Sequence, residues 1–249
     1  MRQLWDTMKI IDCAGSYHYN KNMPRIARVI VPGFPHHVMQ RGNRRLPTFF
    51  CDNDYKHYLQ IMAELCSHWG VEIWAYCLMP NHIHLIAVPD TQEALAGAIG
   101  EAHRRYTWLV NSREKWSGFL WQGRFASFPM DEAYLYLAAR YVELNPMRAG
   151  LVKHAWEYRW SSAAAHLAGR DDALVRVAPL LKMFGDWKEY LQLDISMDEM
   201  DKIKQHTQTG IPLGNETFIA EIEERFGMDF RPQKRGPKGP WKRINVPAD

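Results

Sequence analysis

Two histidines separated by one apolar residue could hold a metal ion. His82 and His84 flank Ile83 in a stretch, Pro80 to Ile86, that has the character of a strand. Side chains alternate between the two faces of a strand, so both imidazoles are expected on one face, roughly 6–7 Å apart along the strand. Two imidazoles placed in this way can share one metal ion. The same pair could instead be polar residues that only make hydrogen bonds.

Several kinds of enzyme use paired histidines, and the neighbouring residues exclude some of them. Histidine-triad nucleotide hydrolases need a third histidine two positions further on, where this chain has Ile86. Two-histidine phosphoesterases repeat a His-x-Thr/Ser pattern, which we do not find. A hydrolytic zinc site usually has three ligands from His, Cys, Asp or Glu, and no third carboxylate near the pair is obvious. The four cysteines form no C-x-x-C pair, so a zinc ribbon is not expected either.

A tyrosine and an asparagine form the second candidate group. Tyr141 and Asn145 are four residues apart on a predicted helix, and therefore lie on one face of it. An amide oxygen can bind a metal ion, and a phenolate can attack phosphorus to form a covalent intermediate. A free phenol has a pKa of about 10, so it needs help to ionise at neutral pH. Taken alone, Tyr141 is better explained as a packed core residue.

Basic residues are concentrated before these motifs and at the end of the chain. Residues 23–50 contain five arginines and no acidic residue, and residues 231–243 are basic and rich in proline and glycine. Such segments could bind nucleic-acid phosphate or bases, although single arginines are often only solvated charges and Trp121 could belong to the core. The predicted DNA contacts are Arg25, Arg28, Arg41, Asn43, Arg44, Arg45, Arg104, Arg105, Trp121, Arg124, Lys234 and Arg235.

The elements that must position these residues follow from periodicity and turn signals. We predict strands over residues 35–41, 71–79, 82–88 and 118–130, with helices over 52–69, 92–110 and from the cap Asp131 to about Asn145. Strand–helix–strand twice, joined by a hairpin, is the ferredoxin-like split βαβ pattern. The predicted fold is therefore α+β, an antiparallel sheet with helices on one face and Ile83, Leu85 and Ala87 in the core.

Composition and patterning divide the chain into four expected segments. Of 249 residues, 47% are hydrophobic and 24% charged, a normal globular mixture with a net charge of only +3. No apolar run approaches the roughly 20 residues of a membrane helix, and scattered cysteines suggest a reducing compartment. We expect a disordered extension over 1–22, a catalytic domain over 23–164, a helical extension over 165–230 and a flexible basic tail over 231–249.

Taken together and in this order, the motifs resemble the REP-associated tyrosine transposases, relatives of the single-tyrosine insertion-sequence transposases in the HUH nuclease superfamily. The resemblance runs from about residue 23 to residue 238. Its segments are Met23-Pro24-Arg25, Arg41-Gly42-Asn43-Arg44, Met79-Pro80-Asn81-His82-Ile83-His84, Leu120-Trp121-Gln122-Gly123-Arg124-Phe125, Tyr141 to Gly150, Gly210 to Gly214 with Phe218-Ile219, and Arg231 to Lys238.

The resemblance implies a mechanism and a substrate. It implies that His82, His84 and Asn145 bind Mg²⁺ or Mn²⁺, and that Tyr141 is the nucleophile that forms a 5′-phosphotyrosine link and frees a 3′-OH. The implied partner is single-stranded DNA folded as a hairpin, the repetitive extragenic palindrome, bound by a monomer. A bacterial cytoplasmic, nucleoid-associated location without membrane attachment is also implied. Because Mg²⁺ prefers oxygen ligands, two imidazoles suggest a weak site better suited to Mn²⁺.

Two other functions remain open from the sequence alone. The chain could be a protein of the same fold that binds hairpin DNA without cutting it, although a pure binder has no need of His82, His84, Tyr141 and Asn145 together. It could also be a metal-dependent phosphohydrolase acting on small nucleotides, which would turn over a mononucleotide ester without forming a covalent link to the protein.

Overall fold

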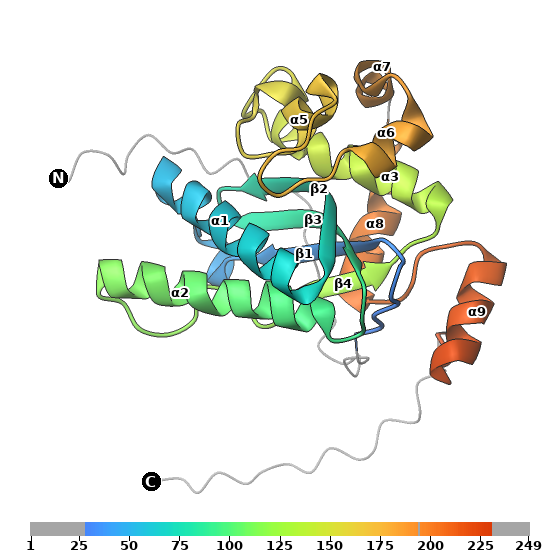
Figure 1. Cartoon of the computed structure of the whole chain (residues 1–249), viewed down its shortest axis with the longest axis horizontal. Coiled ribbons are helices and arrows are strands. Elements are labelled where there is room, and N and C mark those ends of the chain that lie inside the picture. Colours follow the sequence, from blue (N-terminus) through green and yellow to red (C-terminus); the bar gives the residue numbers. More distant parts are fainter. Residues whose placement is uncertain (1–27, 194, 231–249) are drawn as a thin grey trace, which may run out of the picture.

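The centre of the molecule is a four-stranded sheet. A computed structural model describes residues 28–193 and 195–230 of the chain. Its strands are β1 (His36–Arg41), β2 (Val71–Met79), β3 (His82–Pro89) and β4 (Ala126–Pro129), in the order β2-β3-β1-β4 with every neighbouring pair antiparallel (Figure 1). This is the sheet of the predicted ferredoxin-like pattern, and the α+β fold class is confirmed.

One face of the sheet is covered by the two helices that alternate with the strands. They are α1 (Asp52–Trp69) and α2 (Glu101–Glu114), the latter preceded by the π-helical turn η2 (Ala96–Gly100). The strand residues Val38, Ile83 and Leu85 are buried in the same core cluster as these helices, so the predicted inward face of β3 is confirmed. Helix α1 ends at Gly70, whose φ of 64° lies in the left-handed region. A Cβ at Gly97 would lie 2.2 Å from the Trp69 ring, so only glycine permits this close approach.

The other face of the sheet is also covered, a layer that the prediction of helices on one face did not include. Helix α3 (Glu132–Glu143), the short α4 (Asn145–Arg148) and α8 (Met197–Thr209) pack there, and Figure 1 shows α3 and α8 on the side of the sheet away from α1 and α2. Asp131 caps α3 as predicted, because its side chain accepts a hydrogen bond of 2.9 Å from the Tyr134 backbone N–H. Ile86 of β3 and Phe128 of β4 are buried on this side.

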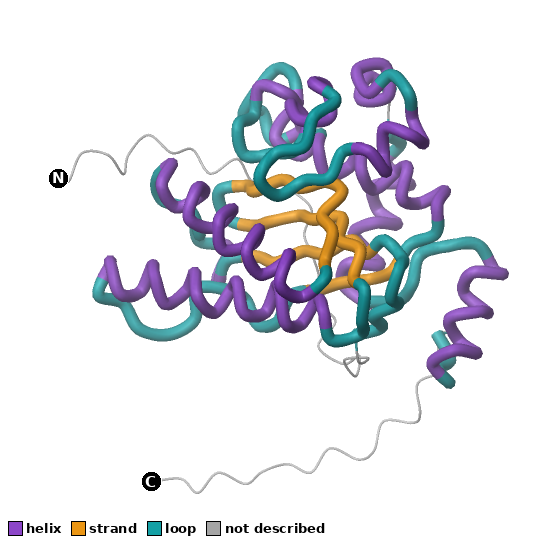
Figure 2. Tube along the Cα trace, in the orientation of Figure 1, coloured by secondary structure: helices purple, strands orange, loops and turns teal. Residues whose placement is uncertain are grey.

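The carboxy-terminal region is helical, as predicted, but it is not separate from the sheet. Its other helices are α5 (Ala163–Ala168), α6 (Ala178–Phe184), α7 (Trp187–Gln192) and α9 (Glu216–Phe226). Trp187 and Ile203 share a core cluster with the sheet, whereas α9 packs against Val29 and Val31 and lies at the edge of the molecule (Figure 2). The segment limits predicted from the sequence remain predictions.

One predicted strand is shorter than expected. Strand character was expected over residues 118–130, but β4 is only Ala126–Pro129, and residues 118–125 form a loop joined to the residue after β1 by a bridge between Gly42 and Trp121. The helix predicted over 52–69 coincides with α1, whose first helical residue is Asp52. Two short 3-10 helices, η1 (Asn43–Arg45) and η3 (Ala155–Glu157), complete the structure.

Some expectations concern residues that are not described. The extension over 1–22, Arg25, and the tail over 231–249 with Lys234 and Arg235 lie outside the described residues. In the part of the chain that the structure describes, no helix has the length and apolar character needed to cross a bilayer.

Candidate active site and nucleic-acid interface

The two histidines of β3 project from the same face of the sheet. The centroids of the His82 and His84 rings are 5.1 Å apart, with the ring planes nearly perpendicular. Across β1, Arg41 is the Cα partner of His82 and Met39 that of His84. Side chains alternate between the faces of a strand, so the histidines share a face with Ile86, which is buried on the side of the sheet that α3 covers.

Tyr141 of α3 lies beside the second histidine. Its ring centroid is 5.6 Å from that of His84 and 6.0 Å from that of His37, in edge-on contacts. The phenol and the imidazoles belong to segments almost sixty residues apart, and the fold brings them to one place because α3 packs across β2 and β3. The proximity on which the candidate mechanism depends is therefore present.

His82 is oriented by the turn that precedes it. Its Nδ1 is 2.6 Å from Asn81 Oδ1, which can only accept, so Nδ1 carries the proton and Nε2 carries the lone pair. The Asn81 amide is itself fixed because its Nδ2 donates to the Arg45 carbonyl at 3.0 Å. Asn81 thus links His82 to the loop that contains Arg44 and Arg45.

His84 is oriented by a residue that the sequence analysis did not single out. His84 Nδ1 is 2.9 Å from His37 Nε2, His37 Nδ1 is 3.4 Å from Thr207 Oγ1, and Thr207 Oγ1 donates to the Ile203 carbonyl at 2.8 Å. Since the threonine proton goes to Ile203, the hydroxyl accepts from His37, and His37 accepts from His84 Nδ1–H. This chain leaves the lone pair of His84 on Nε2, as for His82. The sequence contained one indication that His37 belongs to the site. On the strand predicted over residues 35–41, its side chain lies on the same face as that of Arg41.

Burial keeps these imidazoles neutral at neutral pH. Desolvation lowers the pKa of His82 to about 3, with Arg41 adding in the same direction. Desolvation also lowers the pKa of His37 to about 3, and that of His84 well below its usual value, with neighbouring histidines and arginines adding to the effect. A histidine must be neutral to bind a metal ion, so both ligand candidates are in the required form.

The imidazoles that this site offers to a metal ion are two, His82 and His84. Among residues 28–193 and 195–230, no three side chains from His, Cys, Asp and Glu come close enough to hold an ion. Each Nδ1 is engaged by a protein partner, as is usual for metal-binding histidines, so each Nε2 has the lone pair that a metal ion would need. Asn145, the predicted third ligand, donates from Nδ2 to the Tyr141 carbonyl at 3.1 Å, which leaves its side-chain oxygen to serve as a ligand.

Arg148 is a second residue that the sequence analysis passed over. Its guanidinium carbon lies 4.2 Å from the centroid of the Tyr141 ring, and its Nη2 donates to the Tyr141 carbonyl at 3.0 Å. A positive charge in this position would attract a phosphate that approaches the phenol. The sequence indicated its role only by position, because Arg148 belongs to the same motif as Tyr141, which runs from Tyr141 to Gly150.

The predicted DNA contacts fall into two groups. The larger group borders the histidine end of the sheet. Asn43 donates to the Phe119 carbonyl at 3.4 Å, Arg28 lies over the Phe125 ring at 4.0 Å, and burial lowers the pKa of Arg28, with the charge of Arg124 adding to the effect. The residues of this group are Arg28, Arg41, Asn43, Arg44, Arg45 and Arg124.

The second group lies away from the histidines. Arg104 and Arg105 both pair with Glu101 on α2, whose inner side packs on the opposite face of the sheet. Trp121 is buried in that same core with its ring 4.5 Å from His103, so its indole is not exposed for stacking. DNA binding by these residues stays a prediction.

Comparisons with known proteins point to one family. Residues 31–145 match the family model described as "Transposase IS200 like". The ISDra2 transposase TnpA of Deinococcus radiodurans is 29% identical over 91 residues, which is 33% of this chain and 64% of that protein. The match thus spans less than two thirds of that relative.

A solved structure gives the same result for the fold. The structure of a REP-associated tyrosine transposase bound to a REP hairpin aligns with a TM-score of 0.52 at 19% identity, over 62% of this chain and 93% of that one. At this level of identity, the match supports the fold alone. Together with the family model, it confirms the resemblance predicted from the sequence.

Proposed function

Because residues 31–145 are an IS200-like transposase segment, we propose that the chain is a DNA strand transferase. In this proposal it cleaves and rejoins single-stranded DNA folded as a hairpin, with Tyr141 as the nucleophile. The observation that carries the proposal is the position of the Tyr141 ring, 5.6 Å from His84 on the face where both histidines project.

The chemical step is a transesterification. The Tyr141 oxygen forms a bond to the scissile phosphorus, the bond from phosphorus to the 3′ oxygen breaks, and the phenol proton passes to solvent while the 3′ oxygen takes one up. The product is a 5′-phosphotyrosine and a free 3′-OH. Attack by a 3′-OH on the same link reverses the step, so cleavage and joining use one site.

The residues around the phenol support this step. Arg148, over the Tyr141 ring, stabilises negative charge on the phenol and on the phosphate. His82 and His84, through Nε2, and Asn145, through its amide oxygen, would hold Mg²⁺ or Mn²⁺. When bound, the ion supplies Lewis-acid polarisation of the scissile phosphate. The two nitrogen ligands favour Mn²⁺ over Mg²⁺ in this site.

Hairpin DNA as the substrate is supported by charge and by the structural relative. The loop that contains Arg44 and Arg45 adjoins the histidines through Asn81, and arginines of this kind bind phosphate. The structural relative is bound to a REP hairpin, and we extend that substrate to this chain, acting as a monomer.

The test is a covalent-adduct assay. The protein is incubated with a labelled hairpin oligonucleotide that has single-stranded flanks, in the presence of Mn²⁺, and the product is separated under denaturing conditions. Wild type is expected to give a DNA-linked band that Tyr141→Phe abolishes. Tyr134→Phe, on the same helix, is the matched control and should keep the band.

The same assay separates the other functions. Retarded mobility of the hairpin in a native gel, without any covalent band for wild type, would show a binding protein that does not cut. Release of product from a mononucleotide ester, again without a covalent band, would show a phosphohydrolase. Either result refutes the proposal.

A further inference from the structure

Two loops lie side by side next to the histidine end of the sheet. The Asn43 backbone N–H donates to the Leu120 carbonyl at 2.8 Å, the Gln122 N–H donates to the Arg41 carbonyl at 2.8 Å, and the ring centroids of Phe50 and Trp116 are 5.6 Å apart. Residues 42–50 and 115–124 therefore form one continuous surface, which we call the two-loop surface.

The two-loop surface exposes large aromatic side chains. Phe119 is 87% exposed, Trp116 is 52% exposed and Phe50 is 42% exposed. Aromatic rings usually contribute to a core, and a cluster left in water and rimmed by polar groups marks a binding site. These rings do not serve the fold in this position, so a ligand that buries them is the natural explanation.

The backbone of the same loops is held in an unfavourable conformation. Among the described residues, the non-glycine positions with positive φ are Arg44 at 55°, Arg45 at 62° and Lys115 at 57°. Lys115 ends α2 at a place where glycine is usual. Strained positions of this kind cluster at functional sites, and here each of them presents a cationic side chain. The conformation and the charge thus point to the same surface.

The charge of the surface favours a polyanion. Residues 42–50 and 115–124 contain Arg44, Arg45, Lys115 and Arg124 and no acidic residue. Aromatic rings interleaved with cations bind single-stranded nucleic acid, because every base has a flat face that stacks while the cations contact the phosphates. A paired stem hides the faces of its bases, so the rings match unpaired nucleotides better than a duplex.

We propose that the two-loop surface stacks the unpaired nucleotides that lead from the hairpin into the active site. This inference rests on the proposed function. The surface adjoins the site directly, because Asn81 accepts from His82 Nδ1 and donates to the Arg45 carbonyl. A strand held on the rings of Phe50, Trp116 and Phe119 continues toward the histidines along this asparagine.

The test measures binding by fluorescence anisotropy without added metal, so that no cleavage occurs. Three probes are compared: a hairpin with a single-stranded flank, the same hairpin with an abasic flank, and the stem alone. Phe119→Ala and Trp116→Ala are each expected to weaken binding of the flanked hairpin by about 5- to 150-fold, the loss of one stacked base. Neither should weaken binding of the abasic probe or of the stem.

Matched controls make the result specific. Trp108→Ala removes a tryptophan that is more exposed than Trp116 but lies within α2, and should leave all three affinities unchanged. Because the substituted rings are exposed, the melting temperature of every variant should equal that of wild type.

The outcomes separate this inference from the proposed function. Equal affinity of wild type for the flanked and the abasic hairpin, or an equal loss for all three probes in Phe119→Ala, would overturn the stacking role. The Tyr141 adduct could still form in that case, and the proposed function would stand. A wild-type protein that binds no hairpin and forms no adduct would refute both, and would leave the exposed rings as a surface for a protein partner.

Discussion

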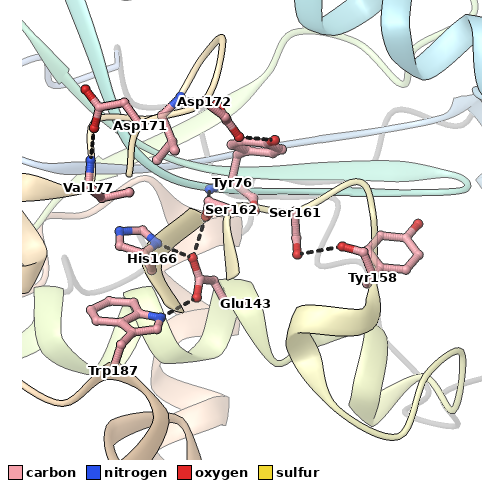
Figure 3. A network of polar contacts seen from close by, with 11 residues as sticks. Tyr76, Glu143, Tyr158, Ser161, Ser162, His166, Asp171, Asp172, Val177 and Trp187 are labelled. Carbon is pink, nitrogen blue, oxygen red and sulfur yellow. Dashed lines mark hydrogen bonds and ion pairs between the residues drawn. The ribbon is translucent and has the colours of Figure 1, made fainter. Parts of the chain in front are cut away.

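The two sides of helix α3 are built in different ways. Tyr141 and Glu143 are two residues apart, so their side chains leave the helix about 200° from each other. On the site side, Tyr141 contacts the rings of His37 and His84 and the guanidinium of Arg148. On the anchor side, Glu143 is fully buried and accepts hydrogen bonds from Ser162 Oγ, His166 Nδ1 at 2.7 Å and Trp187 Nε1 at 2.8 Å (Figure 3).

The difference shows how a reactive side can be kept in place. The anchor side is a buried carboxylate with three directed donors, a costly arrangement unless every partner is present. Ser162 extends it to the sheet, because its Oγ accepts from the Tyr76 backbone N–H of β2 at 2.9 Å. The site side relies mainly on ring contacts, with a hydrogen bond between His37 and His84 beside them. The hydrogen bonds of the anchor side therefore hold α3 rigidly in place, which the contacts of the site side do not do.

The anchor also gives the carboxy-terminal helices a role. His166 belongs to α5 and Trp187 to α7, and their rings stack at a centroid distance of 4.2 Å. Two of the three donors to Glu143 thus come from beyond residue 164. The region predicted from its sequence to be an extension helps to fix the helix that carries the nucleophile.

The largest effect is expected at the anchor. Glu143→Ala leaves three buried donors without an acceptor, and each such loss costs about 1–3 kcal/mol. We expect the free energy of unfolding to fall by about 3–5 kcal/mol, the range seen when a buried charge network loses a partner. Denaturant titration followed by circular dichroism measures this change.

The control for this change lies on the same helix. Glu132→Ala removes an exposed carboxylate from the first turn of α3, and should cost about 0.3–1 kcal/mol through the helix dipole. If the two substitutions had similar effects, the contrast between an anchor side and a site side would be wrong.

Local periodicity was enough to predict most of the frame. The order of strands and helices, the shared face of His82 and His84, and the cap at Asp131 all follow from residue spacing and turn chemistry within about twenty positions. The placement of Tyr141 near them came from resemblance, because no local rule connects residues almost sixty positions apart.

Long-range partners could not be predicted in the same way. The contact of His84 with His37 spans 47 positions, and that of Thr207 with His37 spans 170. Nothing in the sequence near either residue marks such a pair, and the same holds for the donors to Glu143. The exposed ring of Phe119 was missed for a different reason: residues 118–130 were expected to be a strand, in which alternate side chains are buried.

A smaller effect is expected from loss of the hydrogen bond between His37 and His84 on the site side. His37→Phe removes the hydrogen bond to His84 Nδ1 and keeps a ring beside Phe128. Loss of a partner behind a metal ligand typically weakens metal binding by about 10- to 100-fold, and we expect that loss for Mn²⁺, measured by calorimetry in the absence of DNA.

His36→Phe separates orientation of His84 from simple loss of a buried histidine. His36 is fully buried on the same strand, and its Nδ1 bonds to the Phe34 carbonyl at 2.8 Å rather than to a site residue. It should lower stability without changing Mn²⁺ affinity. Unchanged affinity in His37→Phe would show that the site side needs no such support.

The smallest effect is expected at the far end of this chain of hydrogen bonds, and it defines how far the site side extends. Thr207→Val keeps the shape of the side chain on α8 and removes the hydroxyl that contacts His37 at 3.4 Å. Because this contact is long, its loss should cost no more than about 0.5–1.5 kcal/mol of stability, and should weaken Mn²⁺ binding less than His37→Phe does. Thr209→Val, at a half-buried position of the same helix whose hydroxyl bonds to Gln205 and Ile211 rather than to a site residue, is the matched control. If Thr207→Val reduced Mn²⁺ affinity as much as His37→Phe, then α8 would orient His84 as strongly as His37 itself, and both sides of α3 would depend equally on the carboxy-terminal helices.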